Sequence, residues 1–293
     1  MLTRRSLLKS FAVGAAAMSV PGTLLAQDGT ETADQIEALT VKGNIRQSVS
    51  KWCFGKIPMA EFCKICKKLG MVGIDLVGPD DWDLLLKNDM IVTMGSIPGT
   101  GGIPNGFNNV KNHDKLVEAF TKWIPIAAEK KVPNLICMSG NRAGISDEEG
   151  MANCITGLKR IVPIAEKHGV TLCMELLNSL VNHKDYHADH TAWAAEIARK
   201  VGSERFKLLY DIYHMQIMEG NLIDTIRKNK DVIGHYHTGG VPGRKDLDEQ
   251  QEIYHPPVMR AILETGYKGF VAHEFIPKNG LQSLREAVKI CDV

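Results

Sequence analysis

The chain has 293 residues, 44% of them hydrophobic and 24% charged, and its 35 basic and 34 acidic side chains leave a net charge of +1. This near balance, without a basic stripe, excludes the charge pattern expected of a protein that binds nucleic acid. The hydrophobic content is sufficient for one large buried core.

The first 26 residues carry the pattern of an export signal rather than of a folded element. The run TRRSLLK contains Arg4 and Arg5, an apolar stretch follows over residues 11–20, and Ala26 supplies the small residue of a cleavage site. We predict a twin-arginine signal peptide over residues 1–26, with no stable membrane anchor, because the apolar stretch is too short to span a bilayer. The mature protein is then periplasmic; the alternative is a cytoplasmic protein.

Residues 27–42 are polar and predict a linker or an N-terminal extension, and residues 43–293 predict one domain. In that domain, short apolar runs alternate with segments of helical periodicity. The predicted strands cover residues 45–50, 71–77, 90–96, 134–140, 170–176, 206–211, 231–237 and 269–275. The predicted helices cover residues 58–69, 82–87, 113–130, 146–168, 191–201, 221–228, 257–265 and 281–290. Eight alternations predict a closed (β/α)8 TIM barrel, with an open doubly wound sheet as the alternative.

Four consecutive predicted strands finish in titratable side chains. Glu175, Asp211 and Glu274 belong to the fifth, sixth and eighth strands, and the seventh offers His235 and His237 on one face. In a parallel barrel these ends meet at the C-terminal face, where active sites lie. Burying three carboxylates together requires a compensating cation. Oxygen-rich ligands with one imidazole favour one Mn²⁺ or Mg²⁺ ion, with Co²⁺ or Zn²⁺ as alternatives.

The segments MELLN, YDIYHMQ, GHYHTGGVPGR, QEIY and HEFIP occur in this order. Together they resemble the xylose-isomerase-like TIM barrels over about residues 43–292, most of all hydroxypyruvate isomerases and next ketose 3-epimerases. The resemblance implies a metal held by Glu175, Asp211, His237 and Glu274. It also implies that Glu175 and Glu274 act on opposite sides of the ion as catalytic acid and base.

The same resemblance suggests residues that bind substrate. His214 would contact a substrate oxygen, or alternatively cap a helix, and Arg244 would bind or cover the substrate, or alternatively be solvated. Asn178 takes the asparagine place of the family's EPIN motif. His235 is assigned to substrate, and Trp52 would line the pocket or plug the barrel.

Two positions depart from the hydroxypyruvate isomerase pattern. Glutamine is typical where this chain has His237, and histidine followed by Thr238 and Gly239 is the epimerase-like form. Leu177 replaces the proline of EPIN. These departures leave the substrate open between hydroxypyruvate and a ketose.

We therefore predict a metal-dependent isomerase of small hydroxy-carbonyl compounds, most of all one that converts hydroxypyruvate to tartronate semialdehyde through an enediolate. Ketose 3-epimerase and inosose dehydratase are alternatives within the superfamily. A phosphodiesterase related to endonuclease IV is disfavoured because the chain lacks a basic DNA-binding face. A non-catalytic, exported carbohydrate-binding barrel is the alternative of another class. Monomer and homo-oligomer both remain open.

Two further clusters have an ordinary structural interpretation. Cys63 and Cys66 form a CxxC inside MAEFCKICKKLG, where they share a helical face, so we expect packing rather than a redox pair. His183, His187 and His190 follow the fifth strand, and we interpret them as a surface loop, with substrate contact as the alternative.

Replacing Arg4 and Arg5 together with lysine tests the predicted signal. The twin-arginine route reads the arginine pair itself, so we expect the variant to stay in the cytoplasm while the native chain is processed near Ala26 and exported. Cell fractionation with immunoblotting measures both. Native chain found unprocessed and only in the cytoplasm would contradict the signal.

Overall fold

The computed structural model describes residues 31–293, so the predicted signal peptide and its cleavage site lie outside the described residues. The strands are β1 (Arg46–Ser50), β2 (Gly73–Asp75), β3 (Ile91–Val92), β4 (Asn134–Cys137), β5 (Thr171–Glu175), β6 (Phe206–Asp211), β7 (Ile233–Thr238) and β8 (Phe270–His273). The α-helices are α1 (Met59–Lys68), α2 (Trp82–Lys87), α3 (His113–Glu129), α4 (Asp147–His168), α5 (Thr191–Val201), α6 (Ile212–Met218), α7 (Leu222–Lys228), α8 (His255–Glu264) and α9 (Gly280–Cys291).

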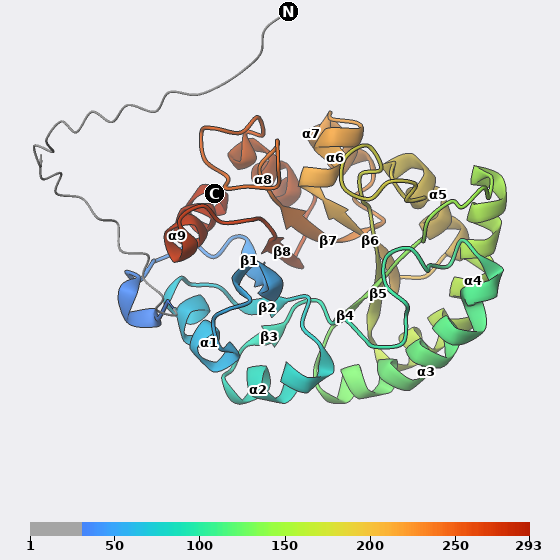
Figure 1. The fold of residues 1–293 in the computed structure, drawn as a ribbon, viewed down its shortest axis with the longest axis horizontal. Coiled ribbons are helices and arrows are strands. Elements are labelled where there is room, and N and C mark those ends of the chain that lie inside the picture. Colours follow the sequence, from blue (N-terminus) through green and yellow to red (C-terminus); the bar gives the residue numbers. More distant parts are fainter. Residues whose placement is uncertain (1–30) are drawn as a thin grey trace, which may run out of the picture. The chain divides into compact units, whose positions relative to one another are not determined.

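All eight strands run parallel in the order β3-β2-β1-β8-β7-β6-β5-β4, and helices surround them (Figure 1). Gly95, just beyond β3, joins the two edges of this sheet. Its N–H donates to the Asn134 carbonyl (2.8 Å), and its own carbonyl accepts from the Ile136 N–H (3.0 Å). The pairing of β1 with β8 confirms the predicted (β/α)8 barrel and excludes the doubly wound sheet.

Several strands are shorter than predicted at their C-terminal ends. The third was expected over residues 90–96 but pairs regularly only over Ile91–Val92, and the eighth ends at His273. The apolar runs continue past these points because the loop residues are buried as well; Met94 and Phe275 are both inaccessible to solvent. The apolar pattern of the sequence therefore indicates which residues are buried, whereas the hydrogen-bonded pairing of the strands ends earlier.

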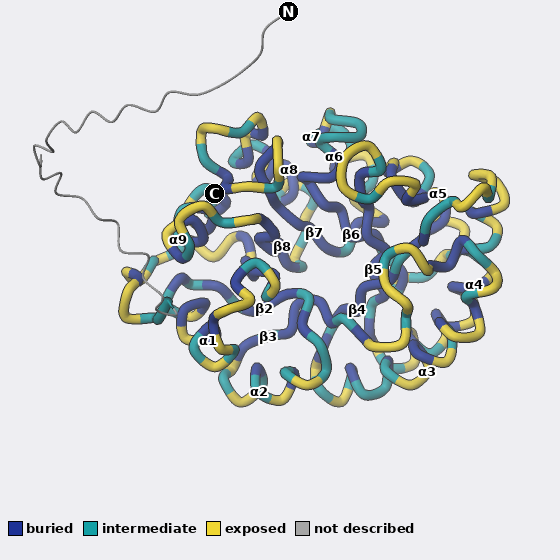
Figure 2. The backbone as a smooth tube through the Cα atoms, viewed as in Figure 1, coloured by how far each residue is buried: buried dark blue, intermediate teal, exposed yellow. Residues whose placement is uncertain are grey.

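The helices bury the side that faces the sheet and expose the other (Figure 2). In α1 the buried face comprises Phe62, Cys63, Ile65 and Cys66, as expected for helix packing. All seven cysteines lie within the described residues, and all are free. Ser146 caps α4 by accepting the Glu149 N–H at 3.2 Å.

The barrel interior is divided between an apolar and a polar half. Met94, Ile136, Cys173 and Leu209, from β3 to β6, form a small hydrophobic cluster of their own. The opposite half carries buried polar side chains that bond to one another: the Thr93 hydroxyl lies 3.0 Å from the Ser48 hydroxyl and 2.6 Å from Asp75 Oδ2, which in turn lies 2.9 Å from His235 Nε2. The candidate site lies where these halves meet.

The ends of the domain lie together. The Lys42 N–H donates to the Asp292 carboxylate (2.8 Å), and the Asn44 side-chain amide donates to the Val293 carbonyl (2.9 Å). Residues 33–35 form a short 3₁₀ helix beside α1, where the Ala33 N–H donates to Glu61 at 2.8 Å. From residue 31 onward, no helix is long and apolar enough to cross a membrane.

His255, the first residue of α8, gives a testable dependence of stability on pH. Burial, in a wall shared with Leu247, Ile253 and Ile290, lowers its pKa from 6.5 to about 4. As the pH falls from 6.5 toward 4, His255 becomes protonated in the unfolded chain but not in the folded protein. The contribution of His255 to stability is therefore complete above pH 6.5 and is lost as the pH falls toward 4, by about 3 kcal/mol.

We expect His255→Leu to flatten this loss, because leucine suits the apolar surroundings and does not ionise. Denaturant unfolding of wild type and variant at about pH 8 and about pH 4.5 measures it. The comparison at the higher pH separates packing effects from ionisation. Equal losses of unfolding free energy in both proteins on acidification would contradict the assignment.

Candidate functional site

Four side chains converge at the C-terminal ends of the last four strands. Glu175 ends β5, Asp211 ends β6, His237 lies on β7, and Glu274 follows β8. Each offers a ligand atom within 4.8 Å of the others, and all four residues are buried. The structure thus brings together the four residues for which sequence predicted a metal site.

The two nitrogens of His237 face different partners. Nδ1 lies 2.5 Å from Glu274 Oε2, 3.4 Å from Glu175 Oε1 and 3.8 Å from Asp211 Oδ2. Nε2 lies 3.0 Å from Oδ1 of Asp75 at the end of β2. The ring therefore points one nitrogen into the carboxylate group and has the other fixed from behind.

Asp75 is the site residue that sequence reasoning missed. Its Oδ2 lies 2.9 Å from His235 Nε2 and accepts the Thr93 hydroxyl at 2.6 Å, so it orients both histidines of β7. Metal-binding histidines commonly donate their second N–H to such a carboxylate. The signal was present, because MVGIDLV also carries an acid at its strand end, but none of the five resemblance segments includes it.

These residues fit a divalent cation. His237 Nδ1 and Glu274 Oε2 face each other in the buried interior at 2.5 Å, and no hydrogen bond of regular geometry joins the two atoms. Three carboxylates and one imidazole are ligands that Mn²⁺, Mg²⁺ and related ions accept. Three buried carboxylates this close to one another are costly unless positive charge compensates them, and a bound cation would supply such charge.

In the metal-free protein the two glutamates have opposite pKa shifts. Burial raises the pKa of Glu175 to about 7, and the charges of Glu274 and Asp211 act in the same direction. Burial opposes ionisation of Glu274 too, but Arg244 and His237 outweigh it and lower that pKa to about 2. The environment therefore distinguishes two acids of the same type.

Arg244, in the loop after β7, adds a positive charge directly beside the cluster. Its Nη2 lies 2.8 Å from Asp211 Oδ2 and 2.6 Å from Glu274 Oε2. The guanidinium carbon lies 5.6 Å from the ring centre of Trp52 and 5.5 Å from that of Tyr213. The side chain is only 14% exposed, so the structure does not place it as a solvated arginine.

A cavity of about 330 Å³ opens beside the cluster. Trp52 forms part of its wall, donates its indole N–H to Glu274 Oε1 at 2.6 Å, and is 46% exposed rather than plugging the barrel. His183 also reaches this cavity. Much of the remaining lining is apolar, from Leu76, Ile103, Ile136, Met138 and Leu177.

Three of the expected substrate-binding residues lie behind the lining. His214 is buried in α6; its N–H donates to Asp211 Oδ1 at 3.1 Å, and its Nδ1 accepts the Asn178 N–H at 3.1 Å. The Asn178 side chain contacts His214 Nδ1 at 2.7 Å as well as residues of its own loop, and His235 faces Asp75. In the described chain none of the three is among the residues that line the cavity.

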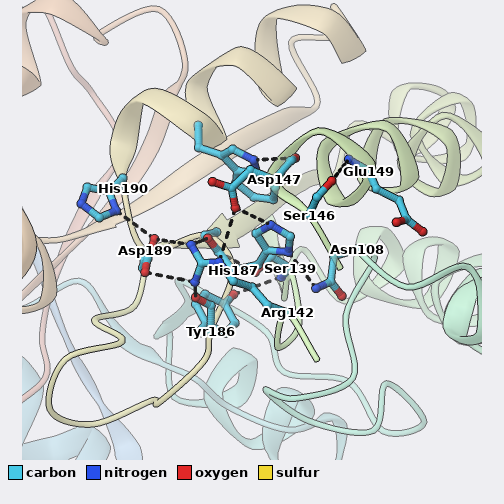
Figure 3. A network of polar contacts seen from close by, with 12 residues as sticks. Asn108, Ser139, Arg142, Ser146, Asp147, Glu149, Tyr186, His187, Asp189 and His190 are labelled. Atoms are coloured by element: carbon cyan, nitrogen blue, oxygen red, sulfur yellow. Dashed lines mark hydrogen bonds and ion pairs between the residues drawn. The ribbon is translucent and has the colours of Figure 1, made fainter. Parts of the chain in front are cut away.

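His187 and His190 belong to a separate polar network (Figure 3). His187 lies between Asn108 Nδ2 at 3.0 Å and Asp147 Oδ1 at 3.1 Å, and its ring stacks on Trp193 with centroids 4.4 Å apart. His190 contacts Asp189 at 2.8 Å and is half exposed. This network supports the loop after β5 rather than the cavity wall.

Comparison with known proteins agrees with this geometry. The family model described as "Xylose isomerase-like TIM barrel" matches residues 55–291, so the chain belongs to that family. Hydroxypyruvate isomerase of Escherichia coli is 27% identical over 241 residues, which cover 77% of this chain and 90% of that protein. The resemblance to this family seen in the sequence is thereby confirmed.

Other relatives match over shorter stretches. A human protein with the provisional name hydroxypyruvate isomerase is 32% identical over 135 residues, 45% of this chain and 49% of that protein. D-psicose 3-epimerase of Enterocloster bolteae is 30% identical over 141 residues, 46% of this chain and 44% of that protein. The chain therefore matches only about half the length of these two relatives.

A solved structure confirms the architecture. The structure titled as an AP endonuclease, family 2, of Brucella melitensis superposes with a TM-score of 0.70 at 22% identity. The match covers 82% of this chain and 96% of that one. At this identity the likeness concerns the fold alone.

Elemental analysis of protein purified without chelators tests the candidate ligand set. We expect about one divalent ion per chain, reduced by Asp211→Ala and by His237→Ala. Their melting temperatures should also respond less to added metal, because an ion bound only to the folded state stabilises it, by about 2.7 kcal/mol at a hundredfold excess over Kd.

Asp246→Ala is the matched control. Asp246 is also a buried aspartate, bonded to the Ser283 hydroxyl at 2.8 Å, but it lies outside the ligand cluster. We expect this variant to be less stable yet to retain the ion. A metal-free wild type whose melting does not respond to Mn²⁺, Mg²⁺, Co²⁺ or Zn²⁺ would contradict the site.

Proposed function

We propose that this protein is a divalent-metal-dependent isomerase of small hydroxy-carbonyl compounds, with hydroxypyruvate as its substrate and tartronate semialdehyde as its product. The observation that carries the proposal is the convergence of Glu175, Asp211, His237 and Glu274 at the barrel mouth. The E. coli relative, with its 90% coverage, supports the choice of substrate.

The ion, when bound, polarises the substrate carbonyl and acidifies the neighbouring C–H bond. Glu175 and Glu274 handle the proton: one removes it from the hydroxymethyl carbon and the other delivers a proton to the former carbonyl carbon, or one glutamate does both. The two electrons of the broken C–H bond enter the enediolate and return in the new C–H bond, while the proton of the hydroxymethyl oxygen passes to the former carbonyl oxygen. Substrate and product therefore have the same atoms, and no external oxidant is needed.

Arg244 is the group that we assign to the substrate's negative charge. Its guanidinium already lies at the junction of the cluster and the cavity, held by Asp211 and Glu274. A guanidinium can bind a carboxylate through two parallel hydrogen bonds. Asp75 and Trp52 then serve the chemistry indirectly, by fixing His237 and Glu274 through their contacts at 3.0 and 2.6 Å.

We propose Mn²⁺ or Mg²⁺ as the ion and the periplasm as its location. Raw affinity at a nitrogen and oxygen site favours copper or zinc over manganese. Export of a folded protein by the twin-arginine route would let the cytoplasm determine which ion is bound. This gives a physical reason for Arg4 and Arg5 to precede a metal-dependent barrel.

Ketose 3-epimerase is the second candidate, and a specific observation favours it. His237 followed by Thr238 and Gly239 is the epimerase-like form of this strand end, and the E. bolteae epimerase is among the relatives. The same proton chemistry applies, except that the proton returns to the opposite face of the carbon from which it left. The cluster serves both reactions, so the choice must be made with substrates.

Incubating the Mn²⁺-loaded protein with hydroxypyruvate, ketoses and inososes in D₂O tests the proposal. We expect deuterium at the hydroxymethyl carbon of recovered hydroxypyruvate and at the former carbonyl carbon of the product, together with the appearance of an aldehyde, all followed by NMR. Exchange into a ketose at C3 with inversion would instead select the epimerase. Loss of water from an inosose would select the dehydratase, and no exchange would favour a binding protein.

The double variant Glu175→Gln/Glu274→Gln should fold and lose exchange, and each single variant should lose about 10²- to 10⁴-fold. Glu219→Gln is the control, because Glu219 binds Thr191 outside the cavity. Exchange at the wild-type rate in the double variant would refute the roles assigned to the two glutamates.

A further inference from the structure

Strands β4 and β5 separate just before the candidate site. Their ladder ends with the pair of Cys137 and Met174, one residue short of Glu175. Residues 186–188 lie between the two strand extensions from that point. The His187 N–H donates on one side, at 2.9 Å, to the carbonyl of residue 140, and the carbonyl of residue 188 accepts on the other, at 3.3 Å, from the N–H of residue 177.

The Tyr186 hydroxyl fills the gap at the level of Glu175. It accepts the Ser139 N–H at 3.0 Å and lies 3.0 Å from the Glu175 carbonyl oxygen. Tyr186 is fully buried, and its phenol has a single proton to donate. Since the Ser139 amide can only donate, that proton is directed to the Glu175 carbonyl.

The backbone of Tyr186 is itself clamped (Figure 3). Arg142 Nη1 donates to the Tyr186 carbonyl at 2.5 Å, and the same guanidinium binds the two oxygens of Asp189 at 3.2 and 3.0 Å. Asn141 and Tyr186 also form an isolated antiparallel bridge. The hydroxyl is therefore held by a rigid segment and is not free to follow the strand end.

We propose that Tyr186 is a positioning residue for Glu175. Its hydroxyl replaces the strand-to-strand hydrogen bond that β4 no longer supplies, and so fixes the backbone from which the Glu175 carboxylate reaches His237 and Asp211. Small displacements of a reacting group cost large factors in rate, and partners outside the ligand shell commonly affect metal affinity. The catalytic part of this proposal rests on the proposed isomerase function; its effect on ion binding does not.

Two tyrosine-to-phenylalanine variants make a matched pair. Tyr186→Phe removes the hydroxyl at Glu175. Tyr267→Phe removes a hydroxyl that lies 3.0 Å from the carbonyls of Gly234 and Phe270, between the starts of β7 and β8 at the opposite end of the barrel. Each change deletes one oxygen that bridges neighbouring strands, and we expect both to lower the melting temperature.

Only Tyr186→Phe should affect the site. We expect its Kd for Mn²⁺, measured by the EPR signal of the free ion, to rise about tenfold. Its kcat for deuterium exchange should fall by a similar factor while KM stays near the wild-type value. Tyr267→Phe should match wild type in all three quantities. Should Tyr186→Phe not fold, Arg142→Lys, which loosens the clamp on Tyr186 but keeps the charge, should move Kd and kcat in the same directions.

Equal Mn²⁺ affinities and equal kcat in the two phenylalanine variants would overturn the positioning role. A wild type that binds Mn²⁺ but exchanges no proton with any substrate would refute the proposed function instead. The Mn²⁺ affinities of Tyr186→Phe and Tyr267→Phe would then decide the positioning role alone. The experiments can therefore contradict the positioning role of Tyr186 and the proposed isomerase function independently of each other.

Discussion

Three carboxylates buried within reach of one another are the constraint on which the rest of the barrel depends. Glu175, Asp211 and Glu274 cannot all ionise in a low-dielectric interior without compensating charge. The Arg244 guanidinium supplies one positive charge, and a divalent cation on the four ligands would supply the other two. Arg244 and the proposed ion are therefore complementary, and removing either leaves an uncompensated buried charge.

This constraint accounts for the division of the barrel interior. On one side of the interior, Ser48 of β1, Asp75 of β2 and His235 and His237 of β7 are polar. Asp75 orients His237 and is joined to Ser48 through the Thr93 hydroxyl. The other half is packed with apolar side chains from β3 to β6. Asp211 belongs to the carboxylate cluster and also caps a helix. One of its oxygens accepts the N–H at the start of α6, while the other faces Arg244 and His237. A candidate metal ligand and a helix cap are here the same residue.

Local patterns, apolar periodicity and acids at strand ends, were sufficient for the fold and for the three converging carboxylates, whereas the choice of His237 over His235 came from the family resemblance. They were insufficient where the contact is long-range. Asp75 and His237 are 162 residues apart, and nothing near Asp75 indicates its partner. Arg244 points inward and has a φ of +54°, and the neighbouring residues in the sequence indicate neither feature. Tyr186 lies in the loop after β5, and from the sequence only the histidines of that loop were considered.

The pairing of β1 with β8 also has a consequence for the order of events during synthesis. The first strand made by the ribosome must wait for the last before the ring can close, and Glu274 arrives with that last strand. Until then the nascent chain carries an incomplete ligand set and two unpaired strand edges. Binding of the proposed ion by all four ligands would therefore be a late step, because it requires Glu274. A circular permutant that begins at β5 and ends at β4 would place all four ligand strands first, and so would separate chain completion from assembly of the ligand set.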